Sequence, residues 1–119
     1  MGDITAAGII AEIGNINRFK NSTSLASYAG LVWYVNQSGN FKAENTKLTK
    51  KGNKYLRTYL VMAANSLRIH NPVFKEYYRK KFYQSNSHHH MRALILTARK
   101  SVNLIFYLLK NNVPYIPMK

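Results

Sequence analysis

Length, composition and charge limit what this chain can be. It has 119 residues, 46% of them hydrophobic, which suffices for one buried core and excludes a disordered chain. Lys and Arg number 18 against 4 Asp and Glu, so the formal charge of +14 favours a polyanionic partner, and the absence of cysteine excludes disulfides and thiolate metal sites.

The first expected element is a helix that begins at Ile4. Asp3 can cap it, and Gly14 is a natural stop. Its apolar residues fall at helical spacing, and they are Ile4, Ala7, Ile10, Ala11 and Ile13.

A second helix is expected within RFKNSTSLASYAG, residues 18–30. Asn21 or Ser22 can cap it, and Gly30 ends it. Two short helices joined through Gly14 are typical of a helix-hairpin-helix, which presents backbone N–H groups to phosphates without reading sequence. An ordinary helical pair has the same spacing, so both interpretations stay open.

A short extended or hairpin segment is expected around residues 31–48. The sequence LVWYV, residues 31–35, is β-branched and aromatic and predicts a strand. Ser38-Gly39-Asn40 is typical of a turn, and residues 41–48 can return as a second strand. Residues 49–53 then form a loop that leads into the third helix.

Three helices are expected in the second half of the chain. The third helix ends at Asn71-Pro72, and its apolar face comprises Leu56, Leu60, Ala63, Ala64 and Leu67. A basic and aromatic helix covers residues 72–83, and a last helix runs from about His89 to Lys110. The apolar stripe of the last helix is Leu94, Ala98, Val102, Ile105 and Leu109. The sequence therefore predicts a mainly α fold, a single small helical domain over residues 1–119 with a helix-hairpin-helix-like start and a long C-terminal helix.

Metal chemistry finds little support in the sequence. His88, His89 and His90 are adjacent, so their side chains would point in different directions, and a surface helix start explains them better than a metal site. The acids are spread from Asp3 to Glu76, whereas a two-metal phosphodiester enzyme needs clustered carboxylates. We expect no cofactor and no complete metal-dependent nuclease site in this chain.

The strongest internal signal is a group of basic residues between positions 42 and 57. Lysines neutralise phosphates, and the start of a helix adds oriented N–H donors. The residues expected to contact DNA are Lys42, Lys47, Lys50, Lys51, Lys54 and Arg57. A solvated loop is the alternative interpretation.

Ser38 lies beside this basic group, but most serines before a glycine are turn residues. A serine attacks phosphorus only if its hydroxyl is deprotonated and the developing negative charge is held by cations or metal. The nearby lysines and Arg57 can stabilise that charge, but no histidine lies near Ser38 in the sequence. A base or metal has to come from elsewhere in the fold, from another domain or from another protomer.

The order of several motifs resembles the C-terminal domain of one transposase family. AEIG at a helix end, RF followed by LASYAGL, then SG, TKLTKKGNKYLR and an Ala-rich helix stand in that order. It is similar to the one-ten/one-sixteen/nine-oh-two family of bacterial insertion-sequence transposases, which also includes Piv-type DNA invertases. The resemblance covers roughly residues 3–108. Family members commonly have a proline where Trp33 stands here.

The resemblance implies one part of a larger enzyme. An N-terminal nuclease-like domain, with the fold of Holliday-junction resolvases, carries a DEDD set of acids for which Mg²⁺ is expected, and this domain is missing here. The C-terminal domain carries a serine that attacks the DNA phosphodiester and forms a covalent phosphoserine link. On this resemblance Ser38 is the catalytic nucleophile, and Gly52 and Asn53 join the DNA-binding residues.

Two function classes follow. The first is the serine-bearing, DNA-binding domain of a site-specific transposase or recombinase, inactive without its DEDD domain. The alternative is a non-catalytic module that grips DNA or RNA. The expected partners are DNA, a guide RNA as in some family members, and further copies of the full-length protein. No run of residues approaches a membrane span, so we expect no membrane partner and a cytoplasmic, nucleoid-associated location in a bacterium.

Overall fold

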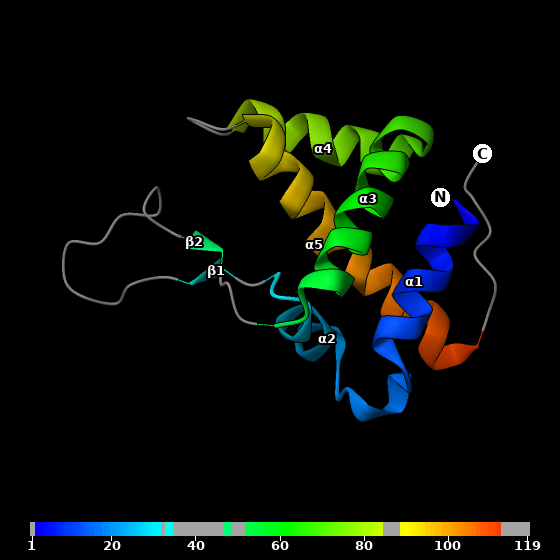
Figure 1. Cartoon of the computed structure of the whole chain (residues 1–119). Coiled ribbons are helices and arrows are strands. Elements are labelled where there is room, and N and C mark those ends of the chain that lie inside the picture. Colours follow the sequence, from blue (N-terminus) through cyan, green and yellow to red (C-terminus); the bar gives the residue numbers. More distant parts are fainter. Residues whose placement is uncertain (1, 32, 35–46, 49–51, 85–88, 113–119) are drawn as a thin grey trace.

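The computed structural model describes residues 2–31, 33–34, 47–48, 52–84 and 89–112. Within these ranges the chain forms five α-helices, one 3-10 turn and a pair of two-residue strands (Figure 1). The mainly α fold predicted from the sequence is confirmed.

Two long helices form the centre of the fold. α3 (Lys54–His70) and α5 (His89–Asn111) pack against each other, and α4 (Pro72–Gln84) packs against both. α1 (Asp3–Ile13) packs on α3, and α2 (Ser22–Tyr28) packs on α5. Figure 1 shows α4 and α2 at opposite ends of the central pair.

The core lies between the apolar faces predicted for the two long helices. All five residues expected on the inner face of α3 are buried, namely Leu56, Leu60, Ala63, Ala64 and Leu67. In α5 the first four residues of the expected stripe are buried and Leu109 is half-buried. Alanines at the helix contact allow the two backbones to approach closely. Each fully buried leucine contributes about 1.5–3 kcal/mol relative to an exposed one.

Two buried hydroxyls in α5 were missed by the sequence analysis. The Thr97 hydroxyl donates to the carbonyl oxygen of Ala93, and the Ser101 hydroxyl donates to that of Ala98, both at 2.7 Å. A hydroxyl that bonds to its own helix leaves no unpaired polar group behind. Thr97 and Ser101 can therefore occupy core positions that the pattern assigned to apolar residues alone.

The first helix begins one residue earlier than expected. Gly2 is its N-cap and makes no side-chain hydrogen bond, so the expected capping role of Asp3 is wrong. Asp3 instead lies in the first turn, where a carboxylate interacts favourably with the helix dipole.

Of the five residues in the apolar spacing predicted for α1, only Ile13 is buried. Ile4 and Ile10 are 81% and 55% exposed, and the buried side chains are those of Thr5, Ile9 and Ile13. Because nearly every residue of DITAAGIIAEI is apolar or small, periodicity cannot select one face. The face is selected by Gly8 instead: a Cβ there would lie 2.5 Å from the Tyr59 ring of α3. The absent side chain lets α1 pack against that ring.

The connection from α1 to α2 contains more than a hairpin turn. Gly14 ends α1 at φ +67°, as predicted, and a 3-10 turn, η1 (Ile16–Arg18), follows. The Asn21 side chain accepts a hydrogen bond from the Ser24 backbone N–H and caps α2. Because α1 packs mainly on α3 and α2 on α5, the helix-hairpin-helix interpretation is not confirmed.

The extended segment expected around residues 31–48 is present as a short antiparallel pair. β1 (Trp33–Tyr34) pairs with β2 (Lys47–Leu48), with Trp33 opposite Leu48 and Tyr34 opposite Lys47. The rest of the two predicted strands and the predicted turn at Ser38-Gly39-Asn40 lie outside the described residues.

The predicted junction at Asn71-Pro72 is confirmed. The backbone N–H of Asn71 donates to the Leu67 carbonyl at the end of α3. Its side-chain oxygen accepts from the backbone N–H groups of Val73 and Phe74 and so caps α4. One residue therefore ends one helix and begins the next.

The histidines mark the start of α5, as the sequence predicted. His89 Nδ1 lies 3.0 Å from the Phe82 carbonyl oxygen, and His90 Nδ1 lies 2.6 Å from the Tyr78 hydroxyl. Both rings contact α4, and His88 lies outside the described residues. These histidines therefore join α4 to α5.

Candidate nucleic-acid interface

Four of the predicted site residues lie outside the part of the chain that the structure describes. They are Ser38, Lys42, Lys50 and Lys51. Lys47 is in β2, opposite Tyr34. The roles assigned to these residues stay predictions, and the other described residues of the predicted site, Gly52, Asn53, Lys54 and Arg57, lie at the start of α3.

Gly52 precedes α3 and lies against the backbone at the end of α2. It has φ +105°, and a Cβ at this position would lie 2.6 Å from the Tyr28 carbonyl oxygen and 2.8 Å from the Gly30 backbone nitrogen. The next residue, Asn53, donates its backbone N–H to the same Tyr28 oxygen at 2.6 Å. Only glycine fits both the backbone conformation and the space.

The Asn53 side chain connects three helices. Its oxygen accepts from the backbone N–H groups of Tyr55 and Leu56, at 2.9 and 3.0 Å, and caps α3. Its amide nitrogen donates to a Glu12 carboxylate oxygen of α1 at 3.1 Å and to the Tyr28 hydroxyl of α2 at 3.2 Å. Both lone pairs and both hydrogens of the amide have partners. Asn53 thus has a structural role that fully occupies its polar atoms.

Arg18 completes this polar junction from the connection between α1 and α2. Its guanidinium carbon lies 4.5 Å from the Tyr28 ring centre and 4.7 Å from that of Phe19, and its Nε donates to the Ile13 carbonyl at 3.0 Å. The hydrogen bonds from Arg18 and, next, from Asn53 lower the pKa of the Tyr28 hydroxyl. We call Glu12, Arg18, Tyr28 and Asn53 the junction cluster.

The junction cluster could not be predicted from the sequence. Asn53 and Glu12 are 41 positions apart, and Asn53 and Tyr28 are 25 apart, so no local pattern joins them. A glycine-asparagine pair before a helix was the available signal, since it is typical of a positive φ followed by a cap.

Lys54 and Arg57 lie in the first turn of α3. Lys54 is exposed, with its ammonium 5.4 Å from the Tyr55 ring centre, and Arg57 is half-buried. Cations at a helix N-terminus oppose the helix dipole, because that end already has positive character. This local repulsion is relieved when an anion binds beside it.

The described residues do not provide a metal site. Nowhere in these ranges do three His, Asp or Glu side chains come close enough together to hold a metal ion. The Glu12 carboxylate already accepts a hydrogen bond from Asn53. The Mg²⁺ expected for a DEDD domain has no ligand set among the residues described here.

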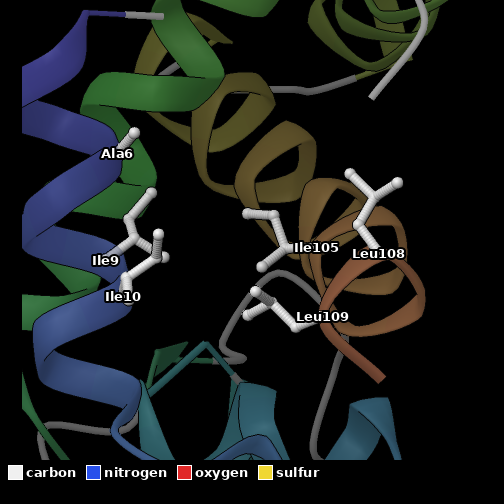
Figure 2. Close-up of a pocket in the computed structure, with 6 residues that line it drawn as sticks. All are labelled: Ala6, Ile9, Ile10, Ile105, Leu108 and Leu109. Atoms are coloured by element: carbon white, nitrogen blue, oxygen red, sulfur yellow. The ribbon is translucent and has the colours of Figure 1, made fainter. Parts of the chain in front are cut away.

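An apolar groove lies away from this polar junction, between α1 and the end of α5. It has a volume of about 130 Å³. Figure 2 shows its aliphatic side chains facing one another across the two helices, and they are Ala6, Ile9, Ile10, Ile105, Leu108 and Leu109. None of these side chains has a donor, an acceptor or a charge, so the groove offers surface for packing and no groups for catalysis. None of the helices in the described ranges has the length and apolar character of a membrane span.

Comparison with known proteins places the chain in a family. A model described as Transposase IS116/IS110/IS902 family matches residues 1–79. The chain is 27% identical over 117 residues to a 44.8 kDa protein of insertion element IS116 from Streptomyces clavuligerus. It is 30% identical over 118 residues to the transposase for insertion sequence element IS1111A from Coxiella burnetii. It is 26% identical over 115 residues to a 43.6 kDa protein of insertion element IS110 from Streptomyces coelicolor.

The chain therefore belongs to the IS116/IS110/IS902 family of transposases. The three alignments cover 98%, 97% and 97% of this chain. They cover 29%, 32% and 28% of the relatives, so the chain spans about a third of their length.

Proposed function

We propose that this chain is the serine-bearing, DNA-binding part of a transposase, in which Ser38 attacks a DNA phosphodiester. The observation that carries the proposal is the family match, because residues 1–79 include Ser38 and the whole basic group from Lys42 to Arg57. The relation to Piv-type invertases belongs to the same proposal.

The described residues support the proposal through charge and anchoring. Lys54 and Arg57 extend the basic group onto the first turn of α3. Gly52 and Asn53 hold that turn against α1 and α2, so the backbone that carries these cations is fixed in position. In this arrangement Gly52 and Asn53 act by positioning, while the lysines and Arg57 neutralise the phosphate.

The proposed step is a displacement at phosphorus. The Ser38 oxygen forms a bond to phosphorus while one bridging P–O bond of the DNA backbone breaks. The serine proton passes to a base, and the departing sugar oxygen takes up a proton. The lysines and Arg57 stabilise the negative charge on the pentavalent phosphate. The base, and any metal, come from outside the described residues of this chain.

Covalent trapping tests the nucleophile. The full-length protein is incubated with end-labelled target DNA and denatured, and labelled protein is counted on a gel. A Ser38→Ala variant is expected to lose the adduct and all strand exchange, whereas Ser27→Ala, which removes an exposed hydroxyl from α2, keeps both. Strand exchange that persists unchanged in Ser38→Ala would falsify the assignment.

A second candidate function is a non-catalytic module that holds DNA or RNA. It is favoured by the chemistry of the described residues, whose exposed basic groups can bind phosphate, whereas the proposed nucleophile Ser38 lies outside them. Salt-sensitive binding without a covalent adduct in the full-length protein supports this module. A guide RNA and assembly from several copies are compatible with both functions and are part of the proposal.

A further inference from the structure

The two helices α4 and α5 carry a large excess of positive charge. The two helices contain eight Lys and Arg residues and a single acid, Glu76. Such an excess opposes folding through self-repulsion and is explained when a polyanion covers it.

Two of these cations lie over one half-buried aromatic ring, and a third, Arg99, is next to one of them in the sequence. The Lys100 ammonium of α5 lies 4.8 Å from the Tyr77 ring centre, and the Lys81 ammonium of α4 lies 5.3 Å from it. Arg99, next to Lys100, is close enough to oppose electrostatically the rise that burial causes in the Tyr77 pKa. The charges of two helices thus converge on one place.

Within the described part of the chain, the partners found for these three cations are neutral. Lys81 also reaches the Gln84 side-chain oxygen at 3.4 Å. Arg99 donates to the side-chain oxygens of Asn103 at 3.0 Å and Thr23 at 3.5 Å. Neutral partners orient a cation and leave its charge available.

We propose that the face around Tyr77, formed by Lys81, Arg99 and Lys100, binds the phosphodiester backbone of a nucleic acid. It shares no residue with the basic group between Lys42 and Arg57, and its binding does not need Ser38. DNA and RNA have the same phosphodiester group, so the experiment measures binding to each of them. Tyr77 acts as a platform that both ammonium groups contact.

A polar surface of this kind suits nucleic acid better than a membrane. A helix that lies on a lipid surface buries an apolar face beside its basic one. On α4 the deeply buried residue, Phe74, faces the core, and the cations around Tyr77 have polar neighbours. We therefore expect weaker binding to vesicles that contain phosphatidylserine than to nucleic acid, and the test includes such vesicles.

The structure provides a matched control on the same helix. Lys75 and Arg79 are both exposed and lie two residues before and after Tyr77. Two residues correspond to about 200° around a helix, so they are on the opposite side of α4 from Tyr77. Lys81 is four residues from Tyr77 and shares its side. The pairs Lys81→Gln with Lys100→Gln, and Lys75→Gln with Arg79→Gln, remove the same charge from different faces.

The experiment measures the affinity of the 119-residue chain for a DNA duplex of about 20 base pairs and for a single-stranded RNA at several salt concentrations. The double variant Lys81→Gln, Lys100→Gln is expected to make the slope of log K against log salt shallower by about 2 with the duplex. The Lys75→Gln, Arg79→Gln variant is expected to stay within about 0.5 of the wild-type slope. The ligand with the larger change identifies which nucleic acid uses this face.

Three results overturn the proposal. They are equal loss in the two double variants, no loss in either, and tighter binding to phosphatidylserine vesicles than to both nucleic acids. Thermal unfolding of each variant checks that it folds, and Lys100→Gln alone repeats the test with half the charge change. The covalent adduct tests the role of Ser38, and the salt-dependent binding tests the face around Tyr77. Because Ser38→Ala should remove the adduct without changing this binding, the failure of one proposal can be told from that of the other.

Discussion

Two tyrosines beside cations, Tyr28 and Tyr77, lie in regions that differ in how their charges are satisfied. Around Tyr28 the polar groups bond to one another. Asn53 donates to both the Tyr28 hydroxyl and the Glu12 carboxylate, and Arg18 stacks on the tyrosine ring. The junction cluster contains one cation and one carboxylate and is electrically balanced.

Around Tyr77 the charges have the same sign. Lys81 and Lys100 lie over the ring, and Arg99 adds a third positive charge nearby. The groups that they contact in the described ranges are a ring, two amide oxygens and a hydroxyl oxygen, which do not reduce the charge.

The difference shows that a tyrosine beside cations can stabilise the fold in one place and form a binding surface in another. The junction cluster saturates its own hydrogen bonds, so mutating it should chiefly change stability. The Tyr77 face has charge in excess, so mutating it should chiefly change binding. Substitutions in the two regions can test whether this division holds.

The largest expected effect is on stability, from Gly52→Ala. The added Cβ would meet the Tyr28 carbonyl oxygen and the Gly30 nitrogen, and φ +105° is strained for alanine. The close contact and the strain together predict a loss of about 3 kcal/mol in the free energy of unfolding, measured by urea denaturation.

Gly14→Ala is the control for Gly52→Ala. Gly14 also has positive φ, at +67°, but a Cβ added there would have no other atom within 4 Å. It should lose only about 1 kcal/mol, from backbone strain. Equal losses at the two glycines would show that the contact of α3 with α2 contributes nothing.

The next effect in size is expected from Asn53→Ala. The variant loses the cap of α3 and both amide donors, so the free energy of unfolding should fall by about 1–2 kcal/mol. Asn53→Ser keeps a capping oxygen and should recover about half of the loss in the same denaturation experiment. If serine restores nothing, the cap is unimportant and the bonds to Glu12 and Tyr28 carry the effect.

The sequence predicted the parts of the fold whose pattern is unambiguous. The face of α3 from Leu56 to Leu67 could be read directly because polar and apolar residues alternate there with helical period, and Pro72 marked the junction of α3 with α4. α1 could not be oriented, since Ile4, Ile9 and Ile10 are equally apolar. Its buried face depends on the fit of Gly8 to Tyr59, a contact between residues far apart in the chain.

The candidate site was predicted less completely than the fold. Asn53 was assigned to DNA binding from the family resemblance, and its bonds to Glu12 and Tyr28 could be found only in the folded structure. The gathering of Lys81 and Lys100 around Tyr77 likewise joins two helices that the sequence shows only separately. The net charge predicted a polyanionic partner, but it could not show which surface of the protein would bind that partner.

The smallest expected effect, a difference in tyrosine titration, tests the contrast most directly. The pKa of Tyr28 is lowered by its hydrogen bonds, so its folded form gains stability as pH rises through that lowered pKa towards 10.0. The pKa of Tyr77 is raised by burial, so the folded form loses stability as pH rises from 10.0 to the raised pKa.

In ¹³C NMR of labelled tyrosines, the Cζ of Tyr28 should therefore titrate at lower pH than that of Tyr77. Arg18→Gln should move only Tyr28, towards its ordinary value, because Arg18 is the main cause of that shift. Titration of both residues at one pH would mean that the bonded cluster and the open cationic face do not differ electrostatically.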